Sequence, residues 1–258
     1  MHALLLLLLA LTAACSSAPP PPLGWRGPYD LDAVRAFLRR APGVEAARTP
    51  PTSVVTRSRV LLYPADGSAP VEATFTLWLR GELQERREIV TAPPLDRTVL
   101  QVIDGDRFLE LEQGVPTGRD LRDELAVHRR YRRLLADFLA DDGAGSGGGA
   151  PVELVEAAGA ESRTTIVLEQ RTPDAARWQL WFDATSGLLR RIRRLTRDGA
   201  SEHVDEDVLD DHARFDGRVL PRHQVTWRDG RRVMESWLQE RVEGEALADD
   251  WFALPAGR

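Results

Sequence analysis

Alternation of apolar and polar residues with a period of two runs through most of this chain and restricts it to a largely sheet-forming fold. The pattern is clearest between positions 71 and 80, where every second residue is apolar: Val71, Ala73, Phe75, Leu77 and Leu79. Similar segments predict strands at 52–63, 84–91, 98–103, 107–111, 152–156, 164–170, 176–183, 188–196, 203–214, 219–228 and 231–242. Asp-Gly pairs at 104–105, 216–217 and 229–230 are typical of tight hairpin turns between such strands.

Two segments change to the helical period. The first begins at Asp30, a good capping residue, and ends near Ala41 before Pro42-Gly43; the second covers about 119–139. About a dozen antiparallel strands with two helices predict an α+β fold whose strands form a strongly curved sheet or incomplete barrel. We expect a single domain over 30–258, with a glycine-rich loop at 143–150 inside it.

The first residues have the character of an export signal. Leucines dominate positions 4–11, small residues follow, and Cys15 is the only cysteine of the 258-residue chain. This arrangement resembles the lipobox of bacterial lipoproteins, and the resemblance implies a signal peptide over 1–14, cleavage after Ala14 and a diacylglyceryl group on Cys15. An ordinary secretory signal with a chance cysteine is the alternative. Residues 15–29 are rich in proline and predict a semi-stiff tether, and Ser16 favours the outer membrane under the sorting rule that the lipobox resemblance implies.

Three short motifs in the last third of the chain resemble those of LolA/LolB-like lipoprotein-sorting proteins. They are the turn Trp-Phe-Asp-Ala-Thr-Ser-Gly-Leu-Leu at 181–189, Phe-Asp-Gly-Arg-Val-Leu-Pro at 215–221, and the closing Asp-Trp-Phe-Ala-Leu-Pro at 250–255. The resemblance implies an unclosed antiparallel barrel with helices as a lid over an apolar cavity. It also implies binding of acyl chains of lipoproteins or of other amphiphiles, without catalytic residues.

Alternation selects a candidate set of cavity-lining side chains. Each group shares one face of its own strand, and the set is Phe75, Leu77, Trp178, Leu180, Phe182, Trp227 and Trp237. A cavity wall and a filled core have the same sequence pattern. The alternative, that these are plain core residues, therefore stays open.

Other candidate sites carry little chemistry. The acidic stretch Asp205, Glu206, Asp207, Asp210 and Asp211 lacks the loop spacing of a calcium site, and His203, His212 and His223 have no compact zinc-ligand spacing. The nucleophile-elbow, dinucleotide and phosphate-loop motifs are missing from the sequence, so we expect no enzyme, metal or cofactor. Arginines at 129, 130, 132 and 133 predict a solvated helix face or a surface for lipid headgroups or an acidic partner.

Together these features predict a membrane-anchored periplasmic lipoprotein that binds acyl chains or lipids as a carrier, acceptor or sensor. Its partners would be the membrane, through lipidated Cys15, and an acyl-chain or lipoprotein cargo. A formal net charge of -6 offers no attraction for nucleic acid. The alternatives are a structural or assembly component of the cell envelope with a filled core, and a hydrolase whose site has no familiar motif.

Overall fold

The computed structural model describes residues 25, 29–42, 51–140, 151–156, 164–173 and 175–254, apart from the side chain of Arg132. The expected signal peptide, Cys15, most of the tether, the glycine-rich run at 143–150 and Pro255 lie outside the described residues.

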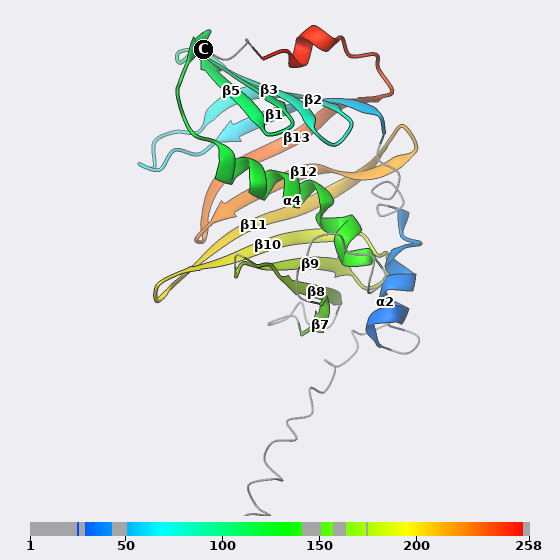
Figure 1. Cartoon of the computed structure of the whole chain (residues 1–258). Helices are drawn as coiled ribbons and strands as arrows, with labels where there is room; N and C mark the ends of the chain where they lie inside the picture. Colours follow the sequence, from blue (N-terminus) through cyan, green and yellow to red (C-terminus); the bar gives the residue numbers. More distant parts are fainter. Residues whose placement is uncertain are drawn as a thin grey trace, which may run out of the picture.

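One antiparallel sheet of thirteen strands forms the body of the described structure (Figure 1). Its spatial order is β6-β5-β4-β3-β2-β1-β13-β12-β11-β10-β9-β8-β7, so β1 pairs with β13 and joins two meanders into one curved sheet. The strands are β1 (Ser53–Leu62), β2 (Val71–Arg80), β3 (Gln84–Thr91), β4 (Thr98–Asp104), β5 (Arg107–Glu112), β6 (Val115–Pro116), β7 (Glu153–Val155), β8 (Thr165–Arg171), β9 (Arg177–Asp183), β10 (Leu189–Asp198), β11 (Ser201–Phe215), β12 (Arg218–Arg228) and β13 (Arg231–Glu243). The outermost strands, β6 and β7, have only two and three residues, which limits the unpaired backbone that the sheet presents at its edges.

Cross-strand pairing shows which side chains share a face. One row runs across nine strands through directly opposed residues: Leu154, Leu168, Leu180, Ile192, Asp207, Thr226, Met234, Leu62 and Val71. Tyr131 of helix α4 (Arg122–Leu139) hydrogen-bonds to Asp207 in this row. In the meander that contains β3, the His128 side chain of α4 contacts Glu85, which pairs with Leu79 of β2 and Ile103 of β4. We refer to the face that meets α4 as the inner face and to the other as the outer face.

Helix α2 (Leu31–Leu38) begins where the sequence predicts, because the Asp30 carboxylate accepts a hydrogen bond from the Ala33 amide at 2.8 Å. Arg35 and the C-cap residue Arg39 bind the C-terminal end of α4, which has no basic residue in its own last turn. Arg35 Nε donates to the Phe138 carbonyl at 3.1 Å, and Arg39 Nε donates to the Leu139 carbonyl at 2.9 Å. Cations on these free carbonyls complement the negative end of the helix dipole.

Two buried clusters fasten the helices to the inner face. The larger one joins α2 and the C-terminal half of α4 to strands β8–β11, and its fully buried side chains include Val34, Leu38, Phe138, Ile166, Leu168, Leu180 and Phe182. The smaller one joins Leu121 and Leu125, at the start of α4, to Ile103 and Phe108. Helix α4 therefore crosses the sheet diagonally and is packed at both of its ends (Figure 1).

The outer face is covered at one end by the last described residues. The short 3-10 helix η2 (Asp249–Phe252) buries Phe252, and the Arg80 guanidinium lies 4.8 Å from the centre of its ring. Trp251 meets Trp78 of β2 edge to face at 5.6 Å. This packing explains why apolar residues recur so close to the end of the sequence.

The predicted fold class is confirmed: the structure is a curved, unclosed antiparallel sheet with helices over one face. Twelve strand segments were expected and each corresponds to a strand, whereas the two-residue strand β6 was not expected. Helix α4 begins at Arg122, three residues later than predicted. In the segment before it, the Thr117 side chain accepts a hydrogen bond from the Arg119 amide, and the Asp120 side chain accepts one from the Arg122 amide.

Candidate functional site

The inner face carries a strip of apolar side chains that belongs to neither buried cluster. It lies on β13, β1, β2, β3 and β4, between the two places where α4 is packed. Leu238, Phe75, Ile89 and Val99 supply the apolar side chains, and the polar Ser58 stands between Leu238 and Phe75 on β1; the five residues oppose one another in register across these five strands. All five side chains are only partly buried. We refer to them as the apolar row.

Neighbouring positions extend the apolar row on β2. Leu77 and Leu79 share its face through pairing with Thr56 and Val54, and both are half-buried. Because adjacent strands lie about 4.8 Å apart, a row that spans five strands is about 19 Å long. The inner face thus presents an elongated apolar surface whose side chains the protein's own core leaves partly uncovered.

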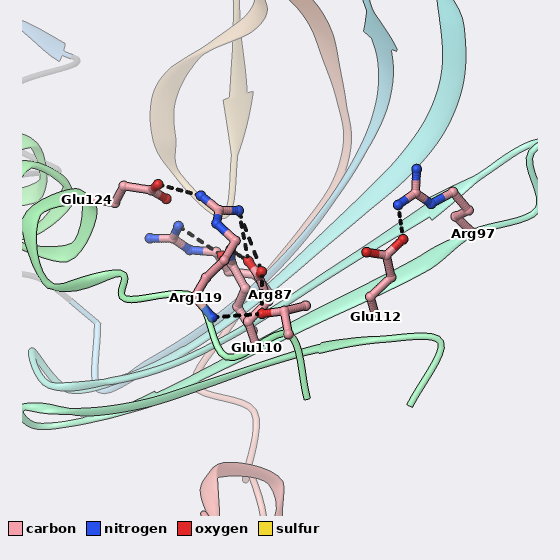
Figure 2. Close-up of polar contacts among 8 residues, drawn as sticks. Arg87, Arg97, Glu110, Glu112, Arg119 and Glu124 are labelled. Carbon is pink, nitrogen blue, oxygen red and sulfur yellow. Dashed lines mark hydrogen bonds and ion pairs between the residues drawn. The ribbon is translucent and has the colours of Figure 1, made fainter. Parts of the chain in front are cut away.

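A charged network borders this surface on the side toward β5. Glu110 of β5 is buried and accepts hydrogen bonds from Gln101 Nε2 at 2.7 Å and Thr117 Oγ1 at 2.9 Å. Arg119 lies 3.4 Å from Glu110 and 2.5 Å from Glu124 at the start of α4. Figure 2 shows Glu110, Arg119 and Glu124 together with Arg87, and Arg97 paired with Glu112 further along the same sheet.

Cations and hydrogen-bond donors contact the carboxylates of this network. Burial by itself would raise the pKa of Glu110, but the hydrogen bonds from Gln101 and Thr117, together with the charge of Arg119, bring the pKa below its usual value. The buried carboxylate of Glu85 is in contact with Arg87 and with His128 Nε2, which lies 3.1 Å from Oε1. These contacts connect the 117–128 segment to β3, β4 and β5, so the network anchors the beginning of α4 over the sheet.

A second polar contact lies beneath the middle of α4. Asp207 is partly buried on the inner face, where Thr226 Oγ1 donates to its carboxylate at 2.6 Å and Tyr131 hydrogen-bonds to it. Burial raises the pKa of Asp207 above its ordinary value, in spite of the hydrogen bonds from Thr226 and Gln224. The pKa of Tyr131 is raised as well, by burial and by the neighbouring carboxylate.

The seven side chains proposed from the sequence do not share one wall. Phe75 and Leu77 are only partly buried on the inner face, as expected of cavity-lining residues. Trp178, Leu180 and Phe182 are also on the inner face, but they are buried in the larger cluster against α2 and α4. For these three residues the structure agrees with the alternative of a filled core.

Trp227 and Trp237 lie on the outer face, and their assignment to the inner wall was wrong. Trp237 pairs with His223 and Arg59, and it is one position away from Leu238 of the apolar row. Its ring stacks on His223, with the ring centres 5.2 Å apart. Trp227 pairs with Glu206, which pairs with Arg193. Alternation separates the two faces of a strand, but strand pairing decides which of them turns inward.

Ile89, Val99 and Leu238 were missed as candidates. Leu79 was missed as well, although alternation alone places it on the same face as Leu77. Ile89, Val99 and Leu238 join the site only because β3, β4 and β13 pair in this register.

The histidines and acidic residues considered as metal ligands are held in separate contacts. His203 Nδ1 lies 3.0 Å from Asp229, His212 Nε2 lies 3.0 Å from the Leu189 carbonyl, and His223 lies between Asp210 and Glu235 at 2.7 and 2.9 Å. Among the residues that the structure describes, no group of three or more potential ligands could hold a metal ion. Over the same residues, no helix is both long and apolar enough to cross a membrane.

Comparison with known proteins shows the fold. Neither a protein-family model nor a curated protein matches the sequence. Among solved structures, a LolA superfamily protein from Nitrosomonas europaea is similar over 88% of this chain and 99% of its own, with a TM-score of 0.57 and 13% identity. A DUF1329 family protein from Desulfovibrio piger is similar over 86% and 97%, with a TM-score of 0.55 and 10% identity. A putative outer membrane lipoprotein-sorting protein domain from Vibrio parahaemolyticus is similar over 86% and 94%, with a TM-score of 0.50 and 10% identity.

Proposed function

From its LolA-like fold, we propose that this chain binds a hydrocarbon chain of a lipid or lipoprotein on the inner face of its sheet, beneath α4. The observation that carries the proposal is the apolar row. It lies between the two clusters that pack α4 and belongs to neither of them. A partly exposed surface with apolar side chains from four of five adjacent strands matches a long, thin, apolar ligand better than a compact polar one.

The dimensions of the apolar row suggest the size of the ligand. With strands about 4.8 Å apart, a chain lying across all five would be about 19 Å long, which corresponds to about 15 carbon atoms in an extended alkyl chain. Each methylene transferred from water to an apolar surface contributes about 0.8 kcal/mol. Partial burial of such a chain is therefore enough for binding without a charged anchor.

The proposal places the protein in the cell envelope. The leucine-rich start of the sequence and the single cysteine support export and lipid attachment at Cys15, and an outer-membrane anchor facing the periplasm. Replacing Cys15 with alanine should move the protein from the membrane fraction to the soluble fraction, because stable anchoring depends on the acyl chains. Unchanged membrane association of the C15A variant would contradict the anchor.

Two adjacent residues provide a matched test of hydrocarbon binding. Ile89 belongs to the apolar row, whereas Val90 points to the outer face and is 38% exposed. The I89Q variant should bind a fluorescent fatty acid at least about tenfold more weakly than the wild type, a loss of about 1.4 kcal/mol. The V90Q variant carries the same chemical change on the other face and should bind normally. Equal affinity of the two variants would contradict the assignment of the site.

A structural or assembly role is the second candidate function. It is favoured by the burial of Trp178, Leu180 and Phe182, which fills one half of the inner face with the protein's own side chains. In that case native mass spectrometry of the purified protein should find no co-purifying lipid, and the wild type should ignore the fluorescent fatty acid.

A further inference from the structure

A hollow on the outer face lies on the opposite side of the sheet from the apolar row. It has a volume of about 470 Å³ and is lined by Arg193, Glu202, His203, Val204, Glu206, Trp227, Asp229 and Gly230. Arg193, Glu206 and Trp227 are neighbours in one cross-strand row of β10, β11 and β12. That row is one position away from the inner-face row through Ile192, Asp207 and Thr226, so its side chains point outward.

The hollow combines one aromatic wall with polar walls. Trp227 supplies the aromatic surface, and Arg232, which is not a lining residue, lies 5.3 Å from the centre of its ring. The remaining side chains that line it are charged or polar, apart from Val204. An indole presents a flat apolar surface together with a polar edge, which suits ligands that have both an apolar and a hydrogen-bonding side.

The charges of the hollow are already paired with one another or with neighbours. Glu206 lies 2.5 Å from Arg193, Glu202 lies 2.6 Å from Arg177, and Asp229 lies 3.0 Å from His203. A charged ligand would have to compete with these ion pairs. Neutral hydroxyl groups can instead hydrogen-bond to oxygens and nitrogens that keep some bonding capacity within an ion pair.

The rim of the hollow is held in place by backbone contacts. Asp229 and Gly230 form the turn between β12 and β13 and both have positive φ, at 49° and 75°. The Asp229 amide donates to the Val204 carbonyl at 2.8 Å, and the Val204 amide donates to the Asp229 carboxylate at 2.8 Å. This reciprocal pair fastens the turn to β11, so a ligand would meet a rim that is already ordered.

We propose that this hollow binds a neutral pyranose, as one or two rings of a glycan. The C–H face of the sugar packs on the Trp227 indole, and its hydroxyls hydrogen-bond to Glu202, His203 and Asp229. The volume lies within the range of about 300–1,000 Å³ that is usual for small-molecule sites. The site is independent of the proposed hydrocarbon site, because the two lie on opposite faces of the sheet.

The experiment is a titration of the protein with a β-1,4-linked tetrasaccharide of N-acetylglucosamine. Binding is measured by calorimetry and by the change in tryptophan fluorescence. The wild type should bind it saturably. W227A should weaken binding at least about tenfold, and E202A should weaken it without a change in melting temperature, since the Glu202 side chain is 41% exposed. W237A is the matched control, because Trp237 lies on the same face but does not line the hollow.

Several results would overturn the glycan site. They are absence of saturable binding at millimolar sugar, equal binding by W227A and the wild type, or an equal loss of binding in W237A. The E202A result still applies if W227A fails to fold. All three variants should bind the fluorescent fatty acid as the wild type does, so failure of the glycan site is distinguishable from failure of the hydrocarbon site.

Discussion

Replacing Gly187 with alanine should destabilise the protein more than the same change at any open turn, because two independent penalties meet at this position. Gly187 lies between β9 and β10 with φ +70°, a conformation that residues with a Cβ rarely adopt. A Cβ built there would also lie 2.6 Å from the Cβ of Ala41 and 3.4 Å from the ring of Phe37, at the point where α2 packs on the turn.

The size of the effect follows from the two penalties. A left-handed conformation costs an alanine about 1–2 kcal/mol, and overpacking a close contact costs typically about 1–3 kcal/mol. G187A should therefore lower the free energy of unfolding by about 2–5 kcal/mol, or roughly 10 °C in melting temperature for a domain of this size. Gly199 has φ +58° and nothing within 4 Å of a built Cβ, so G199A should show only the first penalty.

Chemical denaturation of the wild type, G187A, G199A, A41G and the A41G/G187A double variant measures both penalties. The double variant removes the 2.6 Å contact, so it should recover most of the steric part, and the interaction energy of the cycle should be at least about 1 kcal/mol. Equal destabilisation by G187A and G199A, or additive effects of A41G and G187A, would refute the packing of α2 on this turn.

Two further predictions concern the inner face. F138A should lower the free energy of unfolding by about 3–5 kcal/mol in denaturant titration, because Phe138 is completely buried between α4 and the sheet. D207N should raise the melting temperature at pH 7 and lose this advantage toward pH 4. The folded-state pKa of Asp207 is raised above 3.8, so the ionised carboxyl destabilises the fold as pH rises through that window, and asparagine carries no such charge. A D207N variant that is no more stable than the wild type at pH 7 would contradict this assignment.

Much of the architecture could be predicted from local patterns. The strands, the capped start of α2 at Asp30 and the turn around Gly187 all rest on residues close together in the chain, where period and turn chemistry act directly. The strand pairs joined by tight turns were predictable for the same reason. The pairing of β1 with β13 was not, because it joins residues about 190 positions apart, as in Val54 with Glu243.

The site was harder to predict than the fold. Sequence reasoning placed Phe75 and Leu77 on the inner face but also included Trp227 and Trp237, which the structure places outside. The register shifts between Thr226 and Trp227, and between Arg57 and Ser58, so alternation cannot be carried from one strand to the next by counting. The charged network around Glu110 was not predicted either, because it depends on contacts between separate strands and the start of α4.

The sequence by itself determined that this protein is a curved antiparallel sheet with two amphipathic helices, because period, caps and turns are properties of neighbouring residues. Only the tertiary structure decided which apolar side chains fill the core and which stay partly exposed. That outcome depends on strand register, on bulges and on where α4 crosses the sheet, and these are settled by packing between segments far apart in the chain.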